Sequence, residues 1–498
     1  MKNSYLNFMA RLISVCLLAS LLLASEIFAK EEVVVIPKST YEAILNKLDT
    51  LQKKVDNLEK KGAQVEKKTT ALDSDINDIY DTLDKVETKT IKDRINWGFE
   101  LRTRMDNFKV SDQVNPITRE KDDFSADNHW TTRFRLNMNA ELLKGLTFYG
   151  RLTVYKNWAN SQRVAYYPYA DPNMAHVPSD TSLKLDRAYI DWIVPNSPVP
   201  LAFTIGRQPS SEGPAYEFKE NRKRQSTYPV LLFDGEADGI VATIGLERYI
   251  GLKNSGLRFA YGKGYQSQDD KSVYLDSRYG IDDLNVFGFF FESELPYLPN
   301  SLMVLSYVRG NDFVDNPVDP GKNLGDMDLF GIHLQAPNIL ESGFDFFFSW
   351  GMNISHPNGE YVNMPVGIGS DGQPVTMPVG LLSSNGKDDH TGWAIYTGFR
   401  YTVPFAMLNN PKVGFEYNHG SKNWFSFTQG STELYNKLAT RGDVFDFYYI
   451  QPFNKYLFMR VGYTIVNYNY TGSGWHIGEA METDESLKDF YFLLDCHF

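Results

Sequence analysis

The sequence predicts an all-β protein, a sixteen-stranded antiparallel transmembrane β-barrel preceded by an N-terminal α-helical coiled coil. Three observations predict this class. From about Asn96, apolar and polar residues alternate in one segment after another, which is the period of a β-strand. The connections between these segments are alternately short and long, as in outer-membrane barrels. Residues 39–90 repeat in sevens, which is the period of a coiled coil.

The composition excludes several classes of protein. The 498 residues include 50 Lys and Arg against 62 Asp and Glu, and this acidic balance provides no basic surface for nucleic acid. Two cysteines, Cys16 and Cys496, exclude a disulfide scaffold or a Cys-rich zinc site. Aromatic residues make up 14% of the chain, which is typical of a protein that sits at an interface.

The first 29 residues are expected to be a secretory signal peptide. Lys2 and Arg11 precede an apolar stretch over residues 12–23, and cleavage is expected after Ala29. The apolar stretch is too short to span a bilayer comfortably as a helix. Cys16 is not expected to be lipidated, because Val15 is poorly suited to lipoprotein cleavage.

A coiled coil is predicted over residues 39–90. Its a positions are Tyr41, Leu48, Val55, Gly62, Thr69, Ile76 and Leu83, and its d positions are Ile44, Leu51, Leu58, Val65, Leu72, Ile79 and Val86. Successive g positions are basic and the e positions that follow are acidic: Lys54, Lys61 and Lys68, then Glu59, Glu66 and Asp73. In a parallel assembly each g residue meets the next e residue of its neighbour, so this pattern favours parallel self-association. The heptads alone leave dimer and trimer open, and a solitary charged helix is the alternative.

The barrel is predicted over residues 96–498. The expected strands are 96–105, 129–142, 146–157, 182–194, 200–207, 238–246, 255–264, 284–295, 300–309, 325–336, 342–351, 391–403, 411–419, 442–451, 455–470 and 487–498. Seven short turns alternate with eight long loops, at 106–128, 158–181, 208–237, 265–283, 310–324, 352–390, 420–441 and 471–486. An even-stranded barrel with both ends in the periplasm requires this alternation. A soluble sandwich also alternates residue types along its strands, but it does not require alternating loop lengths.

The last strand resembles an assembly signal. Alternating apolar residues end in an aromatic residue: Phe490, Phe492, Leu494 and Phe498. This ending resembles the signal that the bacterial barrel-assembly machinery recognises. Cys496 on the same face is expected to be a small lipid-facing or packed residue.

The signal peptide, coiled coil and barrel resemble a Gram-negative outer-membrane porin. The layout is similar to a porin-like family with a periplasmic coiled coil, and to phosphate-selective and general diffusion porins. The resemblance rests on layout more than on invariant motifs. It implies a water-filled channel for passive diffusion of small hydrophilic solutes or ions. It also implies a homo-oligomer, most simply a trimer, in the cell outer membrane with the coiled coil in the periplasm.

In sixteen-stranded porins the third loop folds into the barrel, which implies a constriction formed by residues 208–237. This loop carries a basic group and an acidic group that would set up a transverse field: Lys219, Arg222, Lys223 and Arg224, then Asp234, Glu236 and Asp238. The alternative is an ordinary surface loop with scattered salt bridges.

The predicted lumen face is rich in arginine. Its arginines are Arg102, Arg133, Arg135, Arg151, Arg187, Arg258, Arg400 and Arg460. Because a guanidinium group suits carboxylate or phosphate, the row suggests a weak anion preference. Acids on the same face, including Glu100 and Asp345, would reduce that preference.

No enzymatic activity and no cofactor are expected. The histidines, such as His129, His333 and His419, are scattered and form no metal-ligand pair. Aspartates near 269–283 and 312–319 could recruit calcium, but they lack EF-hand spacing. Within 352–390, Met364-Pro365-Val366-Gly367 is repeated as Met377-Pro378-Val379-Gly380, either as a small hairpin or by chance.

A second class of function stays open beside the diffusion channel. The barrel would then be a plugged anchor or part of a conduit, and the coiled coil would hold peptidoglycan or a periplasmic partner. In both classes the barrel contacts outer-membrane lipid. Conductance in planar bilayers separates the two.

Overall fold

The computed structural model describes residues 37–93, 95–114, 120–158, 182–266, 281–316, 321–368, 372–428, 433–473 and 477–498. The chain divides into two compact units, Met1–Thr90 and Ile91–Phe498. The signal peptide expected over residues 1–29 lies outside the described residues.

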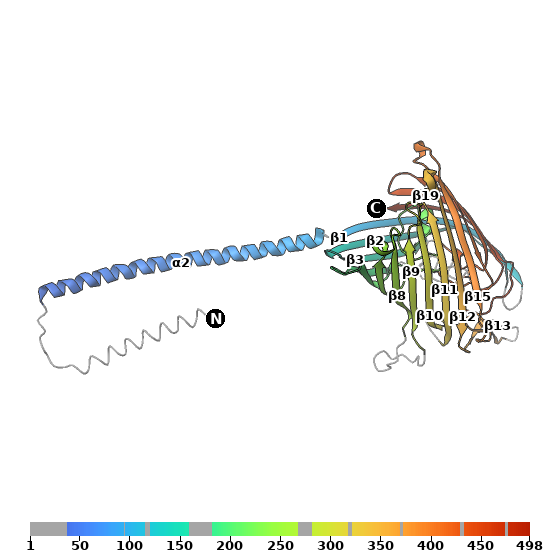
Figure 1. Cartoon of the computed structure of the whole chain (residues 1–498), viewed down its shortest axis with the longest axis horizontal. Coiled ribbons are helices and arrows are strands. Elements are labelled where there is room, and N and C mark those ends of the chain that lie inside the picture. The colour runs from blue at the N-terminus through green and yellow to red at the C-terminus, as the bar shows by residue number, and fades with distance from the viewer. Residues whose placement is uncertain are drawn as a thin grey trace. The chain divides into compact units, whose positions relative to one another are not determined.

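A single helix, α2 (Lys38–Asp93), covers the predicted coiled-coil segment (Figure 1). Leu51 and Leu58 at d positions and Val55 at an a position are exposed in the single chain. They form part of an apolar stripe on an otherwise charged helix. The pairing of this stripe with another copy stays a prediction. No described helix is long and apolar enough to cross a membrane.

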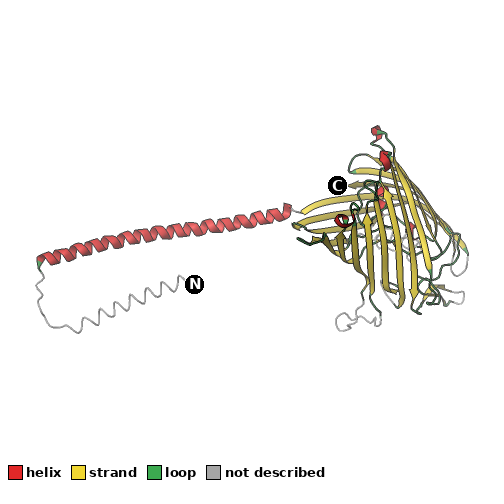
Figure 2. Cartoon of the chain, viewed as in Figure 1, coloured by secondary structure: helices red, strands yellow, loops and turns green. Residues whose placement is uncertain are grey.

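Sixteen antiparallel strands form a closed barrel, because the first strand pairs with the last (Figures 1 and 2). The strands are β1 (Ile95–Val114), β2 (Lys121–Leu143), β3 (Leu146–Asn157), β4 (Ser182–Ile193), β5 (Leu201–Arg207), β7 (Asp238–Gly245), β8 (Gly256–Tyr265), β9 (Leu284–Ser293), β10 (Leu302–Val314), β11 (Asn323–Ala336), β12 (Phe344–Pro357), β15 (Thr391–Thr402), β16 (Lys412–Gly420), β18 (Gly442–Pro452), β19 (Leu457–Tyr468) and β20 (Ser486–His497). The predicted sixteen-stranded barrel is confirmed.

Three predicted loops are shorter than expected. β1 and β2 extend through most of 106–128, so the expectation of a long first loop is wrong. The strands continue because their inward face stays packed: Phe108 and Val110 are buried in a cluster with Leu434 and Val444. The strands flanking 310–324 and 352–390 extend in the same way, to Val314 and to Pro357.

The short repeat within 352–390 forms a hairpin. β13 (Val362–Ile368) pairs antiparallel with β14 (Pro374–Val379), and Met364 lies opposite Met377. The two copies of the repeat are therefore the two strands of one hairpin. The hairpin interpretation of the repeat is the correct one.

The barrel wall has its apolar side chains on the outside and its charged side chains on the inside, which is the reverse of a soluble protein. On β2, Phe134 is exposed while its neighbours Arg133 and Arg135 are buried. On β20, Phe490 is exposed while Asp489 is buried. Large apolar side chains exposed on other strands include Phe99, Leu185, Ile205, Ile240, Phe259, Phe289, Leu305, Ile332, Phe346, Trp393, Phe399, Phe447 and Tyr463. An apolar outer surface is stable only against another apolar medium.

Short elements lie in the connections. Turns contain α4 (Glu247–Ile250), η4 (Ile339–Glu341) and η5 (Ala406–Leu408). Two long connections contain the remaining elements: α3 (Tyr216–Glu220) and β6 (Phe233–Asp234) in one, and β17 (Phe427–Thr428) and η6 (Lys437–Ala439) in the other. These two connections position the candidate site.

Candidate pore constriction

The connection between β5 and β7, residues 208–237, lies against inward-facing side chains of widely separated strands. We call it the first inward loop. Arg400 of β15 donates a hydrogen bond to the carbonyl oxygen of Phe218 at 2.7 Å, and Gln335 of β11 donates to Glu217 Oε1 at 2.7 Å. On another part of the wall, Arg102 of β1 forms an ion pair with Glu220. These contacts place the loop across the interior of the barrel.

A second connection, between β16 and β18, also lies inside; we call its described residues, 421–428 and 433–441, the second inward loop. Phe427 of β17 is the register partner of Phe233 of β6 in a parallel two-stranded sheet. Arg104 of β1 pairs with Glu433 of this loop at 3.0 Å. The sequence pattern identified 420–441 only as one of eight long loops. The signal that could have located it is the apolar run around Trp424 and Phe427, which a surface loop does not need.

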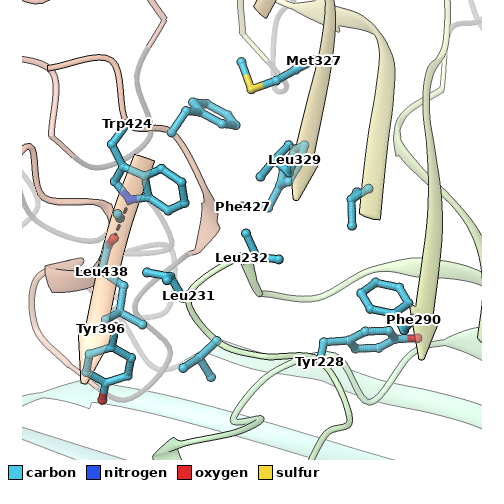
Figure 3. Packing of buried hydrophobic residues seen from close by; sticks show 14 of the residues in the cluster. Tyr228, Leu231, Leu232, Phe290, Met327, Leu329, Tyr396, Trp424, Phe427 and Leu438 are labelled. Carbon is cyan, nitrogen blue, oxygen red and sulfur yellow. Dashed lines mark hydrogen bonds between the residues drawn. The ribbon is translucent and has the colours of Figure 1, made fainter. Parts of the chain in front are cut away.

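The two inward loops share an apolar cluster (Figure 3). Leu231 and Leu232 come from the first loop, and Trp424 and Leu438 come from the second. The Trp424 indole donates a hydrogen bond to the Leu438 carbonyl oxygen at 2.8 Å, as the dashed line shows. Wall residues join the cluster: Tyr228 packs edge-on against Phe290 of β9 with ring centroids 4.8 Å apart. The loops therefore fold as a packed body and not as separate surface loops.

One group of charges surrounds the start of the first inward loop. We call it the arginine cluster; it consists of Arg102, Arg133, Arg135, Arg151, Arg222 and Arg460 with Glu100, Asp186, Glu212, Glu220 and Asp495. Glu212 is its centre, with Arg135 at 2.8 Å and Arg222 at 3.1 Å. Burial alone would raise the pKa of Glu212, but the surrounding guanidinium groups hold this pKa well below its ordinary value. Glu212 is therefore a buried carboxylate that stays ionised.

A second group of charges links the two inward loops to the wall. We call it the lysine cluster; it consists of Lys219, Lys437 and Arg104 with Asp106, Glu416, Glu433, Asp446 and Asp489. Lys219 and Lys437 come from different loops and both pair with Asp446 of β18. Burial alone would lower the pKa of Lys219, but Asp446 and Glu433 keep it above its ordinary value. Carboxylates outnumber cations in this cluster, whereas the reverse holds in the arginine cluster.

The predicted constriction residues have different environments. Lys219 and Arg222 are in the lysine and arginine clusters, and the Asp234 carboxylate accepts a hydrogen bond from the Glu212 backbone N–H at 2.7 Å. The other predicted residues lie elsewhere: Lys223 is exposed, Arg224 lies 3.8 Å from Glu292, and Glu236 and Asp238 pair with Arg207. The basic and acidic groups of the loop thus contact the wall more than they face each other.

The predicted lumen arginines all face inward, but most are shielded from solvent. Arg102, Arg133, Arg135, Arg151, Arg187 and Arg460 are buried, and the side chains of Arg400 and Arg258 are 12% and 13% exposed. Every one except Arg187 forms an ion pair with a carboxylate, and Arg187 donates to the Ser211 carbonyl oxygen at 2.9 Å. The alternation of apolar and polar residues along each strand predicted correctly that these arginines face inward. It did not predict the burial, because burial depends on where the two loops lie.

The residues of the expected assembly signal, on the last strand, lie on the outer face of the barrel. Phe490 and Leu494 are exposed there. Phe498 packs against Phe99 of β1, with ring centroids 5.1 Å apart, next to the seam that closes the barrel. Phe492 contacts Trp130 edge-on at 6.5 Å.

The histidines named above do not form a metal site in the described part of the chain, where no group of three or more metal-ligating side chains occurs. His333 is fully buried between Ser349 and Gln335, at 2.8 and 2.9 Å. It is a packed polar residue of the inner wall. Of the aspartates considered above as calcium ligands, Asp282, Asp312 and Asp315 are among the described residues, whereas Asp269 and Asp319 lie outside them.

A cavity of about 70 Å³ lies between β1, β2, β3 and the second inward loop. Inward residues of the wall line it, among them Arg102, Arg104, Asp106 and Arg133, together with Glu433 of the loop. It therefore lies where the arginine cluster meets the lysine cluster.

Solved structures similar to this chain are outer-membrane proteins. They include OprB of Pseudomonas putida, with 11% identity, a TM-score of 0.45, and coverage of 83% of this chain and 96% of that chain. The anion-selective porin of Comamonas acidovorans has 9% identity, a TM-score of 0.44, and coverage of 81% and 99%. The trimer form of OmpT of Vibrio cholerae has 10% identity, a TM-score of 0.41, and coverage of 81% and 99%.

No curated protein matches the chain. A family model described as "Protein of unknown function (DUF3373)" matches residues 123–492, a range that begins in β2 and ends in β20. The match spans well over half of the chain and includes both inward loops. The chain belongs to the DUF3373 family.

Proposed function

We propose that this protein is an outer-membrane channel for passive diffusion of small hydrophilic solutes or ions. The observation that carries the proposal is the arrangement of the barrel wall, which is apolar outside and charged inside. A closed sheet satisfies the backbone hydrogen bonds of every wall strand, so it can span hydrocarbon. Sixteen strands enclose a lumen wide enough for an aqueous path. The two inward loops narrow that path.

The charges of the arginine cluster and the lysine cluster would determine which ions the channel prefers. The arginine cluster has six cations and five carboxylates, and the lysine cluster has three cations and five carboxylates. Two adjacent groups of opposite excess charge produce a field across the interior, and low-dielectric walls strengthen it. We propose a weak anion preference along the arginine cluster, reduced by the paired carboxylates.

The helix α2 would hold several copies together in the periplasm. The exposed residues Leu51, Val55 and Leu58 lie on one heptad stripe, which fits a parallel homo-oligomer. We propose a trimer formed by the coiled coil and the barrel, with α2 also able to contact peptidoglycan. The outward apolar residues of β20 would be recognised by the barrel-assembly machinery.

A second candidate function is a plugged anchor or conduit component that tethers peptidoglycan or a periplasmic partner. The observation that favours it is the packed apolar cluster shared by the two inward loops, which fills part of the interior. Planar bilayer recordings decide between the two functions. Discrete, stable conductance steps support the channel, whereas correctly folded protein that inserts without conductance supports the anchor.

A further inference from the structure

Two short turns, at the end of the barrel where β1 begins and β20 ends, have large apolar side chains at their tips. Tyr297, between β9 and β10, is 99% exposed, and Leu340 of η4, between β11 and β12, is 88% exposed. Both residues have a left-handed backbone, with φ of 68° and 50°. Asparagine and glycine adopt this conformation readily, whereas a bulky residue rarely does. Neither the local conformation nor burial in the single chain therefore accounts for these two side chains.

The two turns are neighbours on the rim of the barrel, because β9, β10, β11 and β12 lie side by side (Figure 1). The next turn on either side also exposes apolar side chains, Tyr249 of α4 and Met407 of η5. The outer faces of the adjoining strands are apolar as well, with Phe289, Leu305 and Ile332 exposed. The rim thus continues the apolar outer surface of the wall. We call the following four residues the apolar turns: Tyr249, Tyr297, Leu340 and Met407.

The strands that lead into these turns are short for a membrane span. On β10 the outward residue Arg309 pairs with Asp328 of β11 at 3.1 Å, so the apolar outer face ends there in polar groups. Between these groups and the turns lie Leu302–Val308 of β10 and Leu329–Ala336 of β11. A tilted strand needs about 9–11 residues to cross the hydrocarbon layer. Both segments are shorter than this, and the turn residues can supply the missing length.

The turn between β18 and β19 provides a contrast. On β19, Leu457–Val466 lie between the turn and the outward residue Asn467, which is a sufficient length for a membrane span. The tip of this turn consists of Asn454 and Lys455, which are exposed and flanked by aromatic residues. Here a strand that is long enough by itself meets a polar tip. The apolar tips at Tyr297 and Leu340 occur where the strands are too short.

We propose that the apolar turns insert into the inner leaflet of the outer membrane, where phospholipid acyl chains cover Tyr297 and Leu340. Short turns of outer-membrane barrels lie on the periplasmic side, next to this leaflet. Lipid is the favoured partner because the turns continue the outer face that the membrane covers, so one apolar medium contacts both. The inference goes beyond the proposed function, since it concerns the depth of the barrel in the membrane and holds for a conducting or a plugged barrel.

Spin labels test the environment of the turn tips directly. Tyr297→Cys, Leu340→Cys or Asn454→Cys is introduced into full-length protein in which Cys16→Ser and Cys496→Ser remove the native cysteines. The labelled, folded protein is placed in vesicles of phosphatidylethanolamine and phosphatidylglycerol. Labels at 297 and 340 should collide mainly with oxygen, which concentrates in hydrocarbon. The label at 454 should collide mainly with a water-soluble nickel chelate.

The proposal is overturned if labels at 297 and 340 collide with the nickel chelate as often as the label at 454 does. The tips would then lie in water, as they would if their partner were a soluble periplasmic protein, which these vesicles do not contain. All three positions are exposed, so the labels should not disturb folding.

Bilayer thickness provides a second test. Tyr297→Asn together with Leu340→Asn keeps residues that adopt the left-handed backbone but removes the apolar side chains. The midpoint of thermal unfolding should fall by several degrees in vesicles with 18-carbon chains, and by less in vesicles with 12-carbon chains, which the strands alone can span. Asn454→Ser is the matched control and should lower neither midpoint. An equal shift in both kinds of vesicle, or no shift in either, would refute insertion of the turns.

Discussion

The ammonium group of Lys219 in the first inward loop forms a buried ion pair with Glu433 in the second inward loop, 214 residues further along the chain. The same ammonium group pairs with Asp446 on β18. One side chain therefore joins both loops to the wall. Because isolated buried charges are costly, the position of each loop depends on the other.

Removal of this cation should loosen the interior. In Lys219→Met, Glu433 and Asp446 lose a buried partner, and breaking such a pair costs about 3–5 kcal/mol. We expect a lower midpoint of thermal unfolding and faster proteolysis of the two loops. The matched control is Lys223→Met, because Lys223 is an exposed lysine of the same loop. Equal effects of the two substitutions would contradict the linking role of Lys219.

Two glutamates of the first inward loop should respond to pH in opposite directions. The pKa of Glu217 is raised above its ordinary value of 4.5, because burial outweighs its hydrogen bond from Gln335. The folded state then favours the protonated form, and stability falls as pH rises above 4.5. Glu217→Gln should therefore increase the free energy of unfolding at pH 7 and have little effect at pH 4.

Glu212 has the opposite shift, with a pKa held well below 4.5 by its arginine partners despite burial. Its stabilising contribution is present above pH 4.5 and is lost as pH falls through the lowered value. Glu212→Gln should cost about 3–5 kcal/mol at pH 7 and less in acid. Urea unfolding of both variants at several pH values measures this. Parallel pH profiles for the two variants would refute the assignment.

The heptad charges predict the orientation of the coiled coil. Lys54→Glu should weaken self-association of the segment 37–93, because it places like charges at facing g and e positions. Adding Glu59→Lys should restore association, since the pair is then reversed and again opposite in sign. Sedimentation of the three peptides is the measurement. Failure of the double variant to recover would argue against a parallel assembly.

Deletion of residues 39–90 should leave single-protomer conductance unchanged if that segment acts only as a spacer and clamp. The described barrel strands begin at Ile95, beyond the deleted residues. Altered single-channel conductance in the deletion variant would show that α2 contributes to the conducting path. The oligomeric state of the same variant shows whether the clamp is needed for assembly.

Anion preference should depend on inward arginines. Arg187 is the most informative, because among the described residues it is held by Ser211 and by the Gln225 carbonyl oxygen, with no paired carboxylate. Arg187→Gln should shift the reversal potential in a salt gradient toward cations. The control is Arg309→Gln, which changes an arginine on the outer face of β10 that pairs with Asp326 and Asp328, and it should cause no such shift. A cation-selective channel unaffected by Arg187→Gln would remove the basis for the preference.

Sequence alternation predicted every barrel strand and the inward face of the arginines, because the side-chain period of a strand is local information. It did not predict the length of β1 and β2, whose outer ends look polar but are stabilised by Phe108 and Val110 packed against Leu434. It also did not predict that Phe427 pairs with Phe233. That contact joins distant segments, and no local pattern in either loop encodes it.

The most direct test of the central claim is a planar bilayer recording with the purified, detergent-folded protein. We expect spontaneous insertion and discrete, stable conductance steps whose reversal potential responds to Arg187→Gln. A protein that stays dissolved and monomeric without detergent, or one that inserts in folded form and never conducts, would contradict it.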